Sequence, residues 1–182
     1  PNGLFYYDGQ YHLFAQLNPY GFGVGNTHWL HAVSPDLVHW EEMPYALIPD
    51  ESGRMYSGGG IVDVENTSGL GKDGVPPVCL FYTAAGSKSR WSRGRYFEMA
   101  MAYSSDGGRT YQKYEGNPIV PHIAFMNRDP KVVWEPEGKN WVMFIFLDNC
   151  RYQLLYSKDL LHWEEGQVIP LYTAAECPDL FC

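Results

Sequence analysis

The pattern of hydrophobic and polar positions along the chain predicts β-strands. Residues 9–18 alternate between polar and apolar side chains, as expected of a strand with one buried face. Residues 77–83 and 141–147 are short runs rich in β-branched and aromatic side chains, and turn-forming residues bound all three segments. No long stripe of apolar residues at helical spacing competes with them, so the predicted fold class is all-β.

A short segment recurs three times along the chain. Residues 34–42 and 157–165 are nearly the same nonapeptide, and residues 104–111 are a version of it that is longer by one residue. In each copy the Ser and Asp of a Ser-x-Asp sequence can hydrogen-bond to the nearby backbone and close a hairpin corner. The aromatic residues expected to pack beneath the three corners are Trp40, Tyr111 and Trp163.

These corners define a repeating unit of three strands, a corner and a fourth strand. A four-stranded unit that recurs in this way is typical of a blade of a β-propeller. The blades are predicted to span residues 1–56, 57–128 and 129–175, with the start of a fourth blade at residues 176–182. About three blades and the start of a fourth are therefore expected.

Acids stand at two of the predicted blade starts. In a propeller the innermost strand of each blade runs beside the central channel, so side chains at these starts converge although they are far apart in sequence. Asp129 precedes Pro130, and Glu176 lies two residues before Pro178. Proline holds the backbone rigid and so suits a position that aims a side chain. We therefore expect Asp129 and Glu176 to face one another.

Six motifs occur in order along the chain: Pro1-Asn2-Gly3-Leu4, Gln16-x-Asn18-Pro19, His28-Trp29-x-His31-Ala32, Ser57-Gly58, Arg128-Asp129-Pro130 and Glu176-Cys177-Pro178. Together they resemble the motifs of glycoside hydrolase family 32, the invertases, inulinases and levanases. The resemblance implies a five-bladed β-propeller, usually followed by a β-sandwich. It also implies retaining hydrolysis of terminal β-D-fructofuranosyl linkages in fructans (levan or inulin) or in sucrose.

The same resemblance implies roles for the acids. Glu176 matches the general acid/base, Asp129 matches the carboxylate that grips fructose hydroxyls, and the nucleophilic Asp would stand immediately before Pro1. Residues 1–182 alone are accordingly expected to be inactive. A general acid must hold its proton near neutral pH, which burial of Glu176 beside two ionised acids would favour, whereas Asp129 next to Arg128 should stay ionised. The substrate-binding residues are expected to be Asn2, Gln16, Tyr56, Ser57 and Arg128.

Composition and charge narrow the class of partner. The chain has 13 Lys and Arg against 21 Asp and Glu, a formal net charge of −8, which argues against nucleic acids and anionic membranes as partners. Its 14 Tyr, 9 Phe and 6 Trp are typical of sugar-binding clefts, so a carbohydrate is the expected partner. No cofactor or metal is expected, because His28 and His31 would point to opposite faces of a strand and no third ligand is apparent.

Three other functions stay open. Lys88, Arg90, Arg93 and Arg95 could form a phosphate clamp, as a sucrose-6-phosphate hydrolase would need. The corner at 104–111 fits the Asp-box of a sialidase-like propeller, which predicts three arginines and a nucleophilic Tyr. A noncatalytic carbohydrate-binding homologue would keep the sugar-binding groups and lack the nucleophile. A fructan substrate favours an extracellular protein and sucrose 6-phosphate a cytoplasmic one, and the oligomeric state is open.

Overall fold

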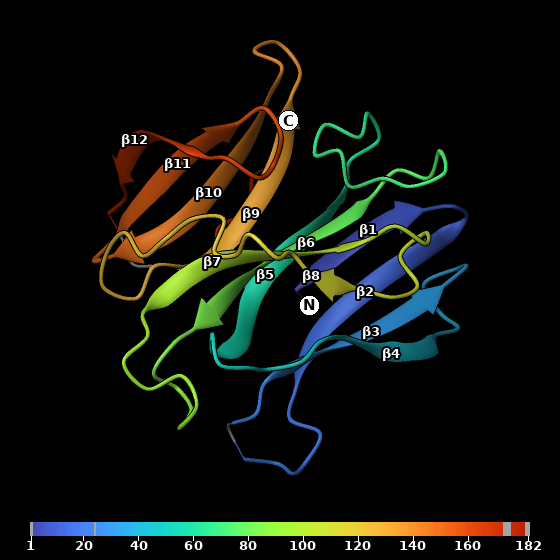
Figure 1. Ribbon diagram of the computed structural model, residues 1–182, viewed down its shortest axis with the longest axis horizontal. Coiled ribbons are helices and arrows are strands. Elements are labelled where there is room, and N and C mark those ends of the chain that lie inside the picture. Colours follow the sequence, from blue (N-terminus) through green and yellow to red (C-terminus); the bar gives the residue numbers. More distant parts are fainter. Residues whose placement is uncertain (1, 24, 173–175, 181–182) are drawn as a thin grey trace.

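The structure, a computed structural model, describes residues 2–23, 25–172 and 176–180, and these residues form three antiparallel sheets of four strands each (Figure 1). The first sheet contains β1 (Gly3–Tyr7), β2 (Gln10–Leu17), β3 (His28–Ser34) and β4 (Glu41–Leu47). The second contains β5 (Arg54–Val62), β6 (Val78–Ala85), β7 (Phe97–Ser104) and β8 (Gln112–Lys113). The third contains β9 (Arg128–Glu135), β10 (Asn140–Asp148), β11 (Arg151–Ser157) and β12 (Glu164–Pro170).

The all-β prediction is confirmed, and so is the order of the repeating unit. The three predicted strand segments correspond to β2, β6 and β10, and each corner lies between the third and fourth strands of its sheet. Within every sheet the strands follow one another in sequence order. Such a meander leaves the first strand of each sheet at one edge, and β5 contacts both β1 and β9. The first strands of the three sheets therefore lie side by side (Figure 1).

The second sheet is packed on both faces. All eight residues of β6 are buried, and successive side chains point to opposite faces of the sheet. Leu80 and Tyr82 belong to the core shared with the first sheet, whereas Phe81 belongs to the core shared with the third. Burial of a side chain of this size contributes roughly 1.5–3 kcal/mol. The continuous apolar run in the sequence thus has a physical reason, because neither face of β6 meets water.

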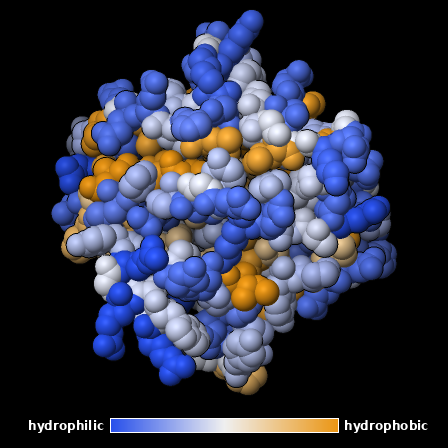
Figure 2. Space-filling view, in the orientation of Figure 1, coloured by the Kyte–Doolittle hydropathy of each residue, from blue (hydrophilic) through white to orange (hydrophobic). Residues whose placement is uncertain are grey.

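The surface contrasts with these cores. The face seen in Figure 2 is largely hydrophilic, and hydrophobic residues show there as separate patches. Among the residues that the structure describes, no helix is long and apolar enough to cross a membrane.

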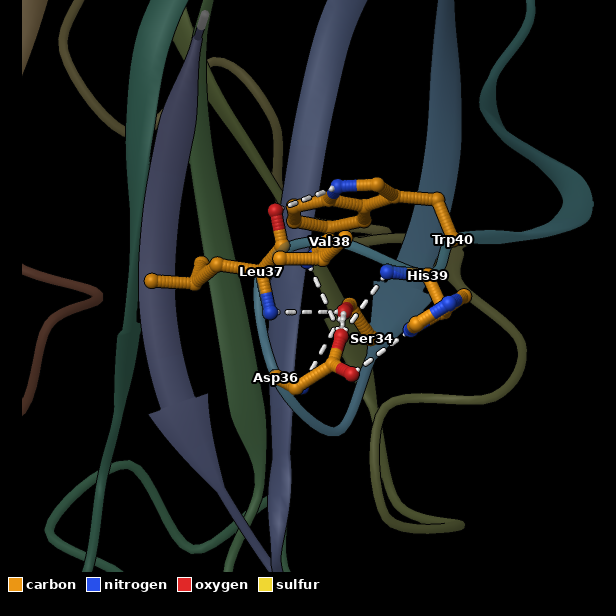
Figure 3. A network of polar contacts seen from close by, with 6 residues as sticks. All are labelled: Ser34, Asp36, Leu37, Val38, His39 and Trp40. Atoms are coloured by element: carbon orange, nitrogen blue, oxygen red, sulfur yellow. Dashed lines mark hydrogen bonds and ion pairs between the residues drawn. The ribbon is translucent and has the colours of Figure 1, made fainter.

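The corner after β3 shows how the repeated motif closes a hairpin (Figure 3). The Ser34 hydroxyl oxygen accepts hydrogen bonds from the amides of Asp36 (3.2 Å) and Leu37 (2.8 Å). The Asp36 carboxylate accepts from the amides two and three residues later, at 2.9 and 2.8 Å. The Trp40 indole donates to the Leu37 carbonyl at 3.1 Å. As predicted, short polar side chains thus accept hydrogen bonds from corner amides that have no partner in a neighbouring strand.

The other two corners repeat this bonding, and their backbone conformations explain why the corner at 104–111 has glycines where the others have leucine. Ser157 and Asp159 accept the corresponding amides of the corner after β11. Leu37 and its counterpart Leu160 adopt positive φ angles of 66° and 65°, and the longer corner has glycines in this conformation instead. Of the three aromatic residues, Trp163 packs edge-on against Phe81 and Tyr111 against Phe14, while Trp40 remains 39% exposed.

A β-bulge interrupts the pairing of β5 with β6. Met55 pairs with Ala84 and Gly58 with Tyr82, so that two residues of β5, Tyr56 and Ser57, stand opposite one residue of β6. A bulge of this kind bends its strand and changes the direction in which a side chain points. Ser57, one of the predicted sugar-binding residues, thus lies at an irregular point of the inner strand.

Gly58, beside this bulge, should tolerate no side chain. A Cβ atom added there would lie 1.9 Å from the carbonyl oxygen of Phe81, a backbone atom that cannot rotate away. We expect Gly58→Ala to lower the free energy of unfolding by roughly 1–3 kcal/mol or more, the cost typical of overpacking. Urea denaturation followed by tryptophan fluorescence measures this. Gly23→Ala is a matched control for crowding, because an added Cβ meets nothing within 4 Å there and Gly23 is not in the left-handed conformation. Equal stability of Gly58→Ala and the wild type would contradict the close approach.

The corners should weaken in acid. The hydrogen bonds from the His39 amide and side chain lower the pKa of Asp36 from 3.8 to about 2. Burial raises the pKa of Asp106, but hydrogen bonds from Ser104 and Thr110 outweigh it and lower this pKa to about 2 as well. The stability contributed by a carboxyl group with a lowered pKa is complete above pH 4 and is lost as the pH falls towards 2.

The free energy of unfolding, measured in urea at several pH values between 6 and 2, should therefore fall below about pH 4. Asp106→Ala should lose stability at pH 6 and show a shallower decline. A wild-type profile that stays flat down to pH 2.5 would contradict this role of the corner acids.

Candidate active site

A pocket of about 290 Å³ opens beside the inner strands of the three sheets, at the first residues of β1 and β9 and the middle of β5. Its walls come from four segments that are far apart in the sequence. The lining residues are Asn2, Gly3, Leu4, Ser57, Gly58, Gly59, Gly60, Asp129, Pro130, Lys131, Cys177, Pro178 and Asp179. Convergence of blade starts, which the sequence analysis expected, thus occurs here, and every segment of the lining carries or adjoins a predicted site residue.

Arg128 brings the two predicted acids together. Its Nη2 donates to Glu176 Oε1 at 2.7 Å, and its Nε lies 3.6 Å from Asp129 Oδ2. The same Asp129 oxygen accepts a hydrogen bond of 3.0 Å from the amide of Cys177, the residue that follows Glu176. The Arg128 guanidinium is held in turn, because it lies over the Phe146 ring, 4.4 Å from the ring centre. Asp129 and Glu176 therefore open onto the same site.

Among the described residues Glu176 is not buried, contrary to the expectation. Its side chain is 66% exposed, and its carboxylate pairs with the Arg128 guanidinium at 2.7 Å. The described residues around Glu176 leave this side chain uncovered, so it lies at the rim of the pocket. The sequence indicated which segment carries the acid, but burial depends on what packs over it.

Asp129 is the buried acid of the pair, with 5% of its surface exposed. This burial raises the pKa of its carboxyl group, and the nearby Glu176 carboxylate also raises it. The hydrogen bond from the Cys177 amide and the charge of Arg128 lower this pKa, but by less. The expectation that Asp129 stays ionised rested on Arg128 alone and did not include this burial.

A second β-bulge orients Asp129. Phe144 of β10 pairs with Lys131 and Phe146 pairs with Arg128, so Asp129 and Pro130 together stand opposite a single residue of β10. Asp129 has a φ of 61°, a left-handed conformation that non-glycine residues rarely adopt. Its amide donates to the hydroxyl oxygen of Thr83 on β6 at 2.9 Å. The acid thus has an irregular backbone that a neighbouring sheet stabilises.

Most of the other predicted binding residues surround these acids. The Gln16 side-chain amide donates to Ser57 Oγ at 2.8 Å, and Ser57 lines the pocket. Asn2 lines it too, and its buried Nδ2 has no hydrogen-bond partner among the described residues. Gln16, Arg128 and Glu176 do not line the pocket themselves, but Gln16 bonds to Ser57 and Arg128 links Glu176 to Asp129. Tyr56 has neither kind of place, because its ring packs edge-on against Phe97 and it is not among the lining residues.

A second ion pair at the pocket was not predicted from the sequence. Lys131 Nζ lies 2.8 Å from Asp179 Oδ1, so two cations of β9 hold the segment that contains Glu176 and Asp179. Lys131 is separated from Asp129 by one residue on a strand, a spacing that could have indicated it. Nothing in the sequence pattern pointed to Asp179.

The two histidines of β3, His28 and His31, serve packing and hydrogen bonding. His31 is fully buried, and its Nε2 is 3.1 Å from Nδ1 of His12. His28 Nδ1 is within hydrogen-bond distance of the Asn26 carbonyl. Among the residues that the structure describes, no group of three His, Cys, Asp or Glu side chains is placed to hold a metal ion.

The features behind two of the alternative functions lie elsewhere. Of the basic residues at 88–95, Lys88 lies over the ring of Phe97 and Arg90 over that of Trp91. Among the described residues, Arg128 is the one arginine that contacts the acids of the site, whereas a sialidase would need three arginines. The Asp-box corner at 104–111 has the same bonding as the other two corners and is structural.

Comparison with known proteins gives a consistent result. The family model described as the glycosyl hydrolases family 32 N-terminal domain matches residues 1–182. A levanase of Bacillus subtilis is 44% identical, over 100% of the chain and 26% of its own length. An invertase of Schizosaccharomyces pombe is 40% identical, over 99% of the chain and 32% of its own length.

Solved structures agree. An exo-inulinase from Aspergillus awamori matches with a TM-score of 0.84 and 35% identity, over 96% of the chain and 38% of that structure. A β-fructofuranosidase from Schwanniomyces occidentalis, complexed with fructosyl-erythritol, matches with a TM-score of 0.82 and 32% identity, over 93% of the chain and 33% of that structure. The chain thus spans less than two fifths of the length of these relatives.

Replacing Arg128 should change the titration of Asp129. Because the guanidinium charge lowers the pKa of this buried acid, Arg128→Leu should raise that pKa further. The measurement is an NMR titration of the ¹³C-labelled Asp129 carboxyl group. Arg151→Leu is a matched control, because Arg151 pairs with Asp148 at the end of β10. An Asp129 pKa that is unchanged or lowered in Arg128→Leu would contradict the coupling.

Proposed function

The chain belongs to glycosyl hydrolase family 32, and from this membership we propose that it forms part of the active site of an enzyme that releases fructose from the terminal β-D-fructofuranosyl linkages of fructans or sucrose. The observation that carries the proposal is the convergence of Asp129 and Glu176 on Arg128 at one pocket. The relatives include a levanase, an invertase and an exo-inulinase, which supports both kinds of substrate.

The two acids differ in a way that suits a division of labour. Glu176 is exposed at the rim, where it can reach the oxygen that links fructose to the rest of the substrate, and it acts as general acid and then as general base. Asp129 lies deeper and is fixed by the Cys177 amide, so it binds fructose hydroxyls and stabilises the positive charge of an oxocarbenium-like transition state. The nucleophilic carboxylate is assigned to the position before Pro1, as the family resemblance implies.

Neutral polar groups complete the proposed sugar site. Asn2 offers an unpaired Nδ2, and Ser57 offers a hydroxyl whose orientation is set by the bond from Gln16. A buried donor without a partner is costly, and a sugar hydroxyl accepting from Asn2 would remove that cost. Fructose carries no charge, so hydroxyl recognition by such neutral groups is the chemistry that its binding needs.

The ion pair between Arg128 and Glu176 has to open during the reaction. A carboxyl group that protonates a leaving group must be free of its cation, and the pair is exposed enough for a substrate to separate it. Sugar entering the pocket would displace water from the rim and place the glycosidic oxygen beside Glu176. Until the pair opens, Arg128 keeps the acid in place.

The test of the proposal is Glu176→Gln in the full-length protein, assayed on sucrose, inulin and levan. Loss of the acid should reduce hydrolysis of all three by about 100-fold or more, the usual contribution of a general acid. With β-fructosyl fluoride as substrate, the leaving group needs no proton, so Glu176→Gln should slow the step that releases it much less.

Glu115→Gln makes the same chemical change at an exposed position outside the pocket and should leave the rates unchanged. Near-normal hydrolysis of every substrate by Glu176→Gln would refute the role of this acid. A wild-type protein that binds fructans without cleaving them would instead favour the noncatalytic homologue.

A further inference from the structure

Thr83 connects the two irregular strands of the site. It lies on β6, is fully buried and is not among the residues that line the pocket. Its hydroxyl oxygen accepts the hydrogen bond of 2.9 Å from the Asp129 amide, and the hydroxyl donates to the Ser57 carbonyl at 3.2 Å. One hydroxyl thus bonds to the backbone of an acid on β9 and of a sugar-binding residue on β5.

Both bonds fall at β-bulges. Tyr56 and Ser57 form the bulge of β5 that stands opposite Thr83, and Asp129 and Pro130 form the bulge of β9. Bulged residues are left out of the regular ladder, so their amide and carbonyl groups need partners from elsewhere. Pro130 has no amide to offer, which makes the Asp129 amide the donor available at this bulge.

The chemistry of the residue matches this position. A hydroxyl group can accept and donate at once, and a threonine side chain has few χ1 rotamers because it is β-branched. A valine of the same shape would leave the Asp129 amide and the Ser57 carbonyl without their partner in a buried place. Asp129 in its strained conformation, with φ at 61°, is the group most sensitive to such a loss.

We propose that Thr83 is a positioning residue for the reaction: its single hydroxyl fixes the separation and orientation of Asp129 and Ser57 by tying together the two bulges that carry them. This inference rests on the proposed function, since it concerns the same site. Thr83 acts through Asp129 and Ser57 and has no contact with the sugar. Small displacements of groups that stabilise a transition state reduce the rate more than they reduce substrate binding.

Thr83→Val in the full-length protein tests this. With sucrose as substrate, we expect kcat to fall by roughly 10- to 100-fold, while KM changes by less than about threefold. Thr83→Ser restores the hydroxyl and should recover kcat to within about threefold of the wild type. A structural role alone would lower the melting temperature and leave kcat per folded molecule unchanged.

Thr67→Val is the matched control. The Thr67 hydroxyl also bridges two elements, since it donates to Asp63 at 2.9 Å and accepts from the Trp141 indole at 2.8 Å. It lies outside the pocket, so Thr67→Val should lower the melting temperature without changing kcat. If Thr83→Val does not fold, Thr83→Ala removes the same hydroxyl without the valine methyl and is judged by the same comparison with Thr83→Ser.

The outcomes separate the two proposals. Wild-type kcat in folded Thr83→Val or Thr83→Ala, with activity lost in Glu176→Gln, would overturn the positioning role and leave the proposed function standing. A Thr83→Ser variant as impaired as Thr83→Val would also overturn it, because the hydroxyl would then not be the feature that matters. A wild-type protein that cleaves no fructoside would refute the proposed function and the inference that rests on it.

Discussion

The burial of both faces of the second sheet is the constraint on which the rest of the structure depends. Because alternate residues of β6 enter two separate cores, the first and third sheets are each packed against this sheet. Every sheet is a simple meander, so its first strand is an edge strand, and the packing brings three such edges together. The pocket forms beside these edges. Its location is therefore a consequence of packing far from the pocket itself.

Within these regular sheets, the residues proposed to bind the substrate lie at irregular backbone positions. In a regular strand, successive side chains point to opposite faces, and this alternation would fix the directions of Ser57 and Asp129. The bulges of β5 and β9 replace that alternation, and the left-handed backbone of Asp129 goes further from the regular geometry. Departures from local rules concentrate at functional sites because the surrounding structure can stabilise them. Here the stabilising partner is Thr83, a residue of the best-packed strand.

The parts that could be predicted from the sequence are those set by local patterns. Alternation and apolar runs predicted strands, and the Ser-x-Asp segments predicted the corners, because these features need only neighbouring residues. Convergence of Asp129 and Glu176 also followed, once the repeat indicated blades. The exposure of Glu176, the direction of the Asp129 pKa and the contribution of Thr83 could not be predicted in this way. Each depends on which residues from another sheet lie within a few ångströms, and register shifts at bulges have no clear sequence signature.

Charge balance at the pocket bears on the proposed reaction. Asp129 and Glu176 are close enough for the charge of one to raise the pKa of the other, and Arg128 holds the two acids together. A neutral sugar cannot offset the repulsion between the two carboxylates, because it brings no positive charge. An oxocarbenium-like transition state can offset it, since its positive charge lies next to the carboxylates that Arg128 has already brought into place. The site would then bind the transition state more strongly than the ground state, which is the requirement for catalysis.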